Sequence, residues 1–287
     1  MRTPTLLLIA LLIATACGPV EEEPDPVATQ VNEATERLTQ NEGGELVLKA
    51  IEAHGGLEAW FSAPTSSYTW EYANVDADLR FKSFLVADNQ TRHVYHDLTL
   101  TGPYDNPDEV EARFAWDGED AWIYPATIEQ PNPRFWGISG YYFQQIPFVL
   151  ADPGVNYERL PDEELDGQTY EMVRTYFEPG VGDSPGDAYT LYVHPESGMV
   201  EAIRYTVSYG RDVEPGADLP ETLMYYEDFE TVDGLTTATS YRGYDFTEDG
   251  QQGDFKNEAF ADSISFQRPF DASKMEAPEG ARFVDLP

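Results

Sequence analysis

The clearest match to a catalytic motif in the sequence is Gly182-Asp183-Ser184-Pro185-Gly186, which has the G-x-S-x-G spacing of a hydrolase nucleophile elbow. In such an elbow, a strand precedes the serine, a helix follows it, and the next residue donates its backbone N–H to the oxyanion hole. Here strand-like alternation lies on both sides of the motif, and Pro185 has no N–H to donate. We therefore predict no serine nucleophile.

The four histidines are the next candidates, as general bases or metal ligands. His93 and His96 lie three residues apart in a segment with strand periodicity, so their side chains point to opposite faces and cannot share a metal. His54 and His194 lie beside turn residues, and no pair has the i, i+4 spacing of a helical zinc site. The sequence predicts histidines that lie at the surface or cap turns, and no metal site.

Carboxylates form three short clusters that could bind calcium or act as an acid and base pair: Asp76/Asp78, Asp117/Glu119/Asp120 and Asp162/Glu163/Glu164. None of them has the ligand register of a known calcium loop, and in a chain with 53 acidic residues such clusters arise by chance. We expect no enzyme activity and no cofactor, and leave incidental calcium binding open.

The single cysteine has a different chemistry. Residues 1–17 contain Arg2, an apolar run over 6–13 and the small residues Ala14-Thr15-Ala16 before Cys17, which is the pattern of a cleaved signal peptide. This site resembles the bacterial lipobox, in which the cysteine is acylated, and two or more acyl chains anchor a protein stably to a membrane. We predict lipidation at Cys17. Gly18, rather than Asp, then resembles the default signal for the outer membrane, facing the periplasm.

The net charge of −36, from 17 Lys and Arg against 53 Asp and Glu, excludes nucleic acid as a partner, because such a surface repels phosphates. Two interpretations remain. The acidity is an adaptation to salty surroundings, which screen the self-repulsion, or it serves to recognise a cationic partner.

Beyond Cys17, residues 18–44 are rich in Glu, Pro and Thr and predict an acidic flexible tether. A helix is expected over 45–53, followed by about ten segments in which apolar and polar residues alternate with a period of two. Residues 134–150 interrupt this alternation with a dense aromatic segment that predicts a broken helix or packed loop. We predict one mainly β (α+β) domain over 45–287: a single curved antiparallel sheet forming an open or half β-barrel, with an N-terminal helix and a central aromatic helical or loop lid.

Aromatic and aliphatic side chains on one face of this sheet, together with those of the lid, are the candidate lining of a hydrophobic cavity, since a wide curved sheet is not filled by its own side chains. They are Trp70, Tyr72, Phe81, Leu98, Phe114, Trp116, Phe135, Trp136, Phe143, Phe148, Leu191, Tyr205 and Tyr225.

Two motifs and the order of the elements resemble a known superfamily. Ala53-His54-Gly55-Gly56-Leu57-Glu58-Ala59-Trp60 opens the domain, and Pro147-Phe148-Val149-Leu150-Ala151-Asp152-Pro153-Gly154 lies at its centre. Over about residues 45–287 the chain resembles the LolA/LolB-like lipoprotein carriers, closest to bacterial envelope lipoproteins with this fold. The resemblance implies an open barrel whose apolar concave face holds an acyl chain, lipid or lipoprotein tail. The alternative is a structural or interaction module that uses its acidic surface for a cationic or calcium-bridged partner.

Overall fold

The computed structural model describes residues 25–178, 183–184, 186–211, 219–247, 250 and 252–287. Cys17 and the signal peptide therefore lie outside the described residues, as does the first part of the predicted tether.

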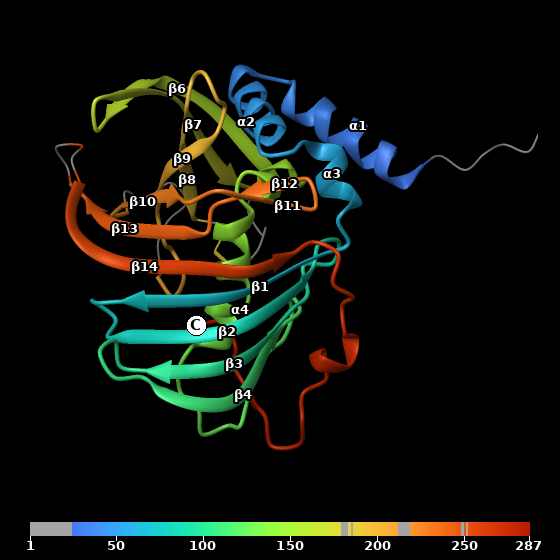
Figure 1. Ribbon diagram of the computed structural model, residues 1–287, viewed down its shortest axis with the longest axis vertical. Helices are drawn as coiled ribbons and strands as arrows, with labels where there is room; N and C mark the ends of the chain where they lie inside the picture. The colour runs from blue at the N-terminus through green and yellow to red at the C-terminus, as the bar shows by residue number, and fades with distance from the viewer. Residues whose placement is uncertain (1–24, 179–182, 185, 212–218, 248–249, 251) are drawn as a thin grey trace, which may run out of the picture.

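Three helices form one end of the molecule (Figure 1): α1 (Pro26–Leu38), α2 (Glu42–Ala53) and α3 (Leu57–Ser62). The side chains of Asp25 and Asn41 accept backbone N–H groups at the starts of α1 and α2, as N-caps do. The predicted helix over 45–53 is confirmed within α2. The predicted tether up to residue 44 is wrong from Pro26 onward, because Ala34 and Leu38 of α1 are fully buried in the main core.

Thirteen antiparallel strands form one sheet, in the order β15-β5-β4-β3-β2-β1-β14-β13-β10-β9-β8-β7-β6. The strands are β1 (Thr65–Asn74), β2 (Leu79–Asp88), β3 (Val94–Gly102), β4 (Asp108–Trp116), β5 (Ala121–Tyr124), β6 (Val155–Leu165), β7 (Gln168–Phe177), β8 (Ala188–Val193), β9 (Val200–Tyr205), β10 (Thr222–Glu227), β13 (Ser240–Phe246), β14 (Gln252–Ser265) and β15 (Arg282–Phe283). The edge strands β15 and β6 do not pair with each other, so the curved sheet stays open. The predicted open, mainly β fold is confirmed.

A two-stranded ribbon, β11 (Glu230–Val232) and β12 (Leu235–Thr237), extends the β10–β13 hairpin toward the N-terminal helices. The backbone N–H of Thr236 donates to the carbonyl oxygen of His54 at 2.7 Å, which joins this ribbon to the end of α2.

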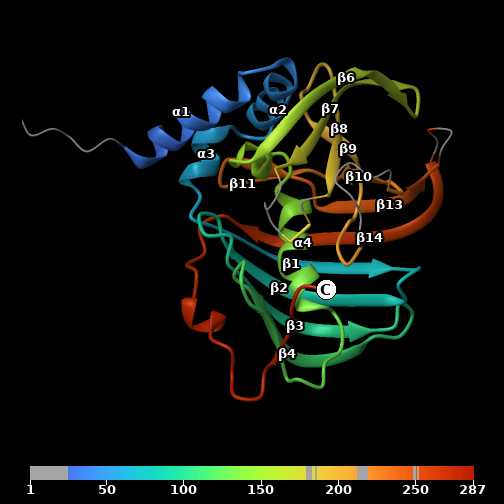
Figure 2. The same ribbon diagram turned by 180° about the vertical axis from the view of Figure 1, so that it is seen from behind.

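The aromatic segment forms α4 (Pro133–Gln145) and the 3-10 turn η1 (Phe148–Ala151), and Figures 1 and 2 show α4 crossing the inner side of the curved sheet. Two glycines allow close contact: a Cβ on Gly137 would lie 2.5 Å from the Cβ of Trp116, and one on Gly140 would lie 3.1 Å from Nε1 of Trp70. The hydroxyl of Tyr68 also donates to the Gly140 carbonyl at 3.1 Å. The predicted central aromatic helix is thus confirmed, and it is packed into the core.

The outer face of β2–β5 is covered by the C-terminal segment, which carries the 3-10 turn η2 (Ala272–Met275) before β15. Phe270, Met275 and Ala281 pack against a small outer cluster of Val86, Tyr95, Ala115 and Trp122. Neither this covering segment nor β15 was predicted from the sequence.

Candidate ligand-binding cavity

A cavity of about 800 Å³ lies between the inner face of the sheet and α4. Its size is within the range of small-molecule sites. Six of the predicted lining residues do line it: Trp70, Tyr72, Phe135, Trp136, Phe143 and Tyr205. Leu79, Val110, Ile128, Val207, Met224 and Ala259 add further apolar surface. Strands β1, β9, β10 and β14 and helix α4 therefore meet around one mainly apolar space.

Ring contacts fix the aromatic wall of the cavity. The ring centroid of Trp136 lies 4.2 Å from that of Tyr72 and 4.9 Å from that of Phe135. Farther along α4, the rings of Phe143 and Tyr205 lie 4.8 Å apart, edge to face. Each ring of this wall therefore packs against a neighbouring ring.

The remaining predicted lining residues do not line this cavity. Phe81, Leu98, Phe114, Phe148 and Leu191 are almost fully buried in the main core.

Trp116 lines a smaller cavity of about 120 Å³, which shares Phe135, Phe143, Tyr205 and Val207 with the larger one. The two cavities therefore adjoin along α4.

The assignment of Tyr225 to the inner face is wrong. Met224 and Tyr226, its neighbours on β10, point into the main core, whereas Tyr225 packs on the outer face beside a cluster that contains Leu223. Its hydroxyl donates to Asp166 at 2.8 Å. β10 carries apolar residues on both faces, so alternation alone did not identify the inward one.

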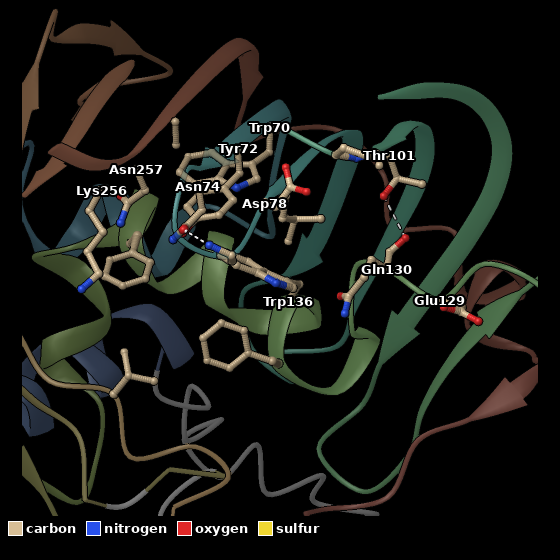
Figure 3. Close-up of a pocket in the computed structure, with 18 of the residues that line it drawn as sticks. Trp70, Tyr72, Asn74, Asp78, Thr101, Glu129, Gln130, Trp136, Lys256 and Asn257 are labelled. Atoms are coloured by element: carbon tan, nitrogen blue, oxygen red, sulfur yellow. Dashed lines mark hydrogen bonds between the residues drawn. The ribbon is translucent and has the colours of Figure 1, made fainter. Parts of the chain in front are cut away.

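Polar side chains lie at two ends of the cavity. Figure 3 shows Asn74, Lys256 and Asn257 at one end and Thr101, Glu129 and Gln130 at the other, with Trp136 between them. None of these residues is among the lining residues predicted from the sequence. The sequence pattern that could have identified them is a polar residue at an inward-facing position of a strand. Asn74, two residues after Tyr72 on β1, is an example.

At the first end, one hydrogen bond joins two neutral side chains. Nδ2 of Asn74 donates to the Tyr72 hydroxyl at 2.9 Å, and burial raises the pKa of Tyr72 far above its ordinary value. Burial also raises the pKa of Tyr205 to about 12, against an opposing effect of hydrogen bonding with Asn257 and Thr222. Both phenols therefore stay protonated at any physiological pH.

Lys256 is the cation at this end, and its Nζ lies 2.6 Å from Oδ1 of Asp245. A second cation, Arg211, lines the cavity from an exposed position, while Asp78, Asp108 and Glu129 contribute carboxylates. The lining thus carries more acidic than basic groups, in keeping with the charge of the whole chain.

Two of the histidines, which were predicted to lie at the surface or to cap turns, are buried. Nε2 of His96 lies 3.1 Å from the Gly137 carbonyl, and Nδ1 lies 2.9 Å from Oγ of Ser83. Nδ1 of His54 lies 2.8 Å from the carbonyl oxygen of Thr236, and Nε2 accepts the N–H of Val200 at 3.1 Å. Burial lowers the pKa of His54 to about 4 and that of His96 to about 3, so both are neutral. Their hydrogen bonds join segments that are far apart in the sequence.

His194 caps the turn between β8 and β9 as predicted, since its Nδ1 accepts the N–H groups of Glu196 and Ser197.

The elbow-like motif falls partly outside the described residues, which omit 182 and 185. Asp183, within it, makes a two-pronged ion pair with Arg134 at 2.6 and 2.9 Å and accepts from Nε1 of Trp116 at 3.3 Å. Its role in the structure is to tie this loop to the start of α4.

Across the part of the chain that the structure describes, no group of three or more His, Cys, Asp and Glu is arranged to hold a metal ion. Nor is any helix in that part long and apolar enough to cross a membrane.

Solved structures of other proteins have a similar fold. A LolA superfamily protein from Nitrosomonas europaea matches with a TM-score of 0.50 and 13% identity, over 80% of this chain and 96% of that one. The chain has the LolA-type fold. A DUF1329 family protein from Desulfovibrio piger matches the LolA-type fold of this chain equally well, with a TM-score of 0.50 and 12% identity, over 88% of this chain and 98% of the other.

At these identities the likeness concerns the fold, and it confirms the resemblance predicted from the sequence. No protein-family model matches the sequence, and no curated protein matches it.

Proposed function

We propose that this protein is a non-enzymatic lipoprotein of the cell envelope that holds a hydrophobic ligand, an acyl chain, lipid or lipoprotein tail, between its sheet and α4. The observation that carries the proposal is the cavity of about 800 Å³ bounded by Trp70, Tyr72, Trp136 and Phe143. A preformed apolar cavity of this size is the usual form of a small-molecule site. The LolA-type fold supports the same assignment by analogy.

The signal sequence and Cys17 support the rest of the proposal. Acylation of Cys17 would anchor the chain, and Gly18 favours the outer membrane, with the domain facing the periplasm. An anchored protein cannot diffuse across the periplasm, so we propose a stationary acceptor or sensor of lipid and not a shuttle.

The test is native mass spectrometry of the full chain expressed in a bacterial envelope and purified without detergent. We expect a species heavier than the protein by the mass of one or a few lipid molecules, released by organic extraction. A protein that carries no lipid and takes up no acyl-chain probe in solution would overturn the proposal.

The net charge of −36 favours a second candidate, an envelope interaction module for a cationic or calcium-bridged partner. Capture of the same partner at low salt, its release at high salt and an empty cavity in native mass spectrometry would support this candidate over lipid binding.

A further inference from the structure

The inference that follows rests on the proposed function and concerns the polar end of the ligand. Two side chains that line the cavity carry a buried polar atom without a hydrogen-bond partner among the described residues, Nε1 of Trp70 and Oδ1 of Asn257, and Nε1 of Trp70 packs against Gly140 of α4. Asn257, on β14, is 2% exposed and lines the cavity, yet its Oδ1 has no hydrogen-bond partner among the described residues. Buried polar atoms in native proteins are nearly always paired, so an unpaired acceptor beside a cavity indicates a partner that the chain itself does not supply.

The neighbouring strands leave room for the Asn257 amide. It lies opposite Asn74 of β1 and Gly243 of β13. A Cβ on Gly243 would overlap with Oδ1 of Asn257, so the glycine leaves the space in which the amide lies. The terminal torsion of asparagine is soft, which allows Oδ1 to turn toward a donor in the cavity.

The hydroxyl groups around Asn257 are neutral. The hydroxyls of Tyr72, Tyr205 and Thr222 line the same end, and both phenols stay protonated because burial raises the pKa of each. Of the two cations that line the cavity, Lys256 is engaged by Asp245 at 2.6 Å and Arg211 lies at an exposed position. In addition, the net charge of −36 opposes the entry of an anion.

From this arrangement we infer that the ligand ends in an uncharged group with a hydrogen-bond donor, such as the hydroxyl of a glycerol or the N–H of an amide, which binds to the Asn257 side chain. The acyl part of the ligand then lies along Tyr72, Trp136 and Phe143. An ionised carboxylate or phosphate end has no donor to offer Oδ1 of Asn257 and meets an already paired lysine.

Three ligands with the same acyl chain test this inference: a monoacylglycerol, the methyl ester of the fatty acid, and the fatty acid at pH 8. Their affinities are measured by displacement of one fluorescent acyl probe from the full chain, for the wild type and for Asn257→Ala. The three ligands differ in hydrophobicity, and so in the free energy that each gains on leaving water. This contribution cancels in the ratio of a ligand's affinity for the wild type to its affinity for Asn257→Ala.

We expect Asn257→Ala to weaken monoacylglycerol about tenfold, the value of one well-placed hydrogen bond, and to change the methyl ester and the fatty acid less than about twofold. The methyl ester also reports whether the variant still folds with an intact cavity. Asn32→Ala, at an exposed site on α1, is the matched control and leaves all three affinities unchanged.

Equal effects of Asn257→Ala on all three ligands would overturn the inference. So would a fatty acid whose binding falls tenfold in Lys256→Gln, because its anionic end would then occupy this place. In both cases the acyl chain still binds and the proposed function stands. Failure of all three ligands to displace the probe, or of the probe to bind, would overturn the proposed function and the inference together.

Discussion

The imidazole of His96 is held between β2 and α4, with Nε2 3.1 Å from the carbonyl oxygen of Gly137 and Nδ1 2.9 Å from the hydroxyl of Ser83. A carbonyl oxygen can only accept, so Nε2 carries the proton and Nδ1 accepts from Ser83. The ring also stacks on Phe114 at 4.1 Å. This neutral histidine therefore fixes the height of α4 above the sheet, and with it one wall of the cavity.

The first prediction concerns pH. Burial lowers the folded-state pKa of His96 to about 3 and of His54 to about 4, below the unfolded value of about 6.5. The unfolded chain thus binds more protons below pH 6.5, and the free energy of unfolding falls as the pH drops through that window. We expect a loss of about 1.4 kcal/mol per pH unit for each histidine between pH 6 and 5, measured by urea unfolding.

His96→Gln should remove about half of this pH dependence, whereas Asn32→Ala, at an exposed and non-ionisable position on α1, should leave the slope as it is. Identical slopes for the wild type and His96→Gln would show that His96 is not buried in its neutral form.

Alternation predicted β1 well and β10 poorly, for a physical reason. On β1 the apolar Tyr68, Trp70 and Tyr72 alternate with Thr69 and Glu71, so one face is specified. On β10, Leu223 and Met224 are both buried, one in the outer cluster and one in the main core. A strand that is covered on both faces has no alternation to detect, and Tyr225 was placed on the wrong face for that reason.

The sequence pattern also gave little indication that the folded part begins with α1. Helix α1 contributes Ala34 and Leu38 to the core, while most of its other side chains are polar and partly or fully exposed. Two buried residues in thirteen give little periodicity, and the helix is stabilised by tertiary contacts such as the 2.8 Å hydrogen bond from Arg37 to the Ala151 carbonyl. The polar residues of the cavity depend on packing that only the assembled sheet and α4 provide.

The second prediction concerns the contact between α4 and the sheet. A Cβ on Gly137 would lie 2.5 Å from the Cβ of Trp116, so Gly137→Ala must displace the helix. Overpacking of this kind costs about 1–3 kcal/mol, and we expect a corresponding fall in the free energy of unfolding and a weaker affinity for acyl probes. Ser139→Ala, on the same helix, removes one hydrogen bond within the helix to Phe135 and should change stability by less than about 0.5 kcal/mol. Similar losses in both variants would contradict the close approach at Gly137.

The third prediction separates the two faces of the sheet. Tyr205→Ala removes an aromatic wall of the cavity, and we expect affinity for an acyl-chain probe to fall about tenfold through lost apolar contact. Tyr225→Ala, on the neighbouring strand, alters the outer face, and its affinity should stay within about twofold of the wild type. Displacement titrations well below the melting temperature of either variant make the comparison, and an equal loss in both would place the ligand elsewhere.

The fourth prediction concerns the acidity of the chain. With a net charge of −36, repulsion between carboxylates destabilises the folded state, and salt at about 1 M shortens the Debye length to about 3 Å. The described ion pairs also weaken in salt, but most of them are partly exposed, and such pairs contribute about 0–1 kcal/mol each. Repulsion should therefore outweigh them, so the melting temperature rises between 0.05 and 1 M NaCl. If screening is the cause, choline chloride, whose cation is bulky, should raise the melting temperature by a similar amount. A melting temperature that rises only with millimolar calcium, and not with NaCl or choline chloride, would instead favour specific cation binding by the acidic surface.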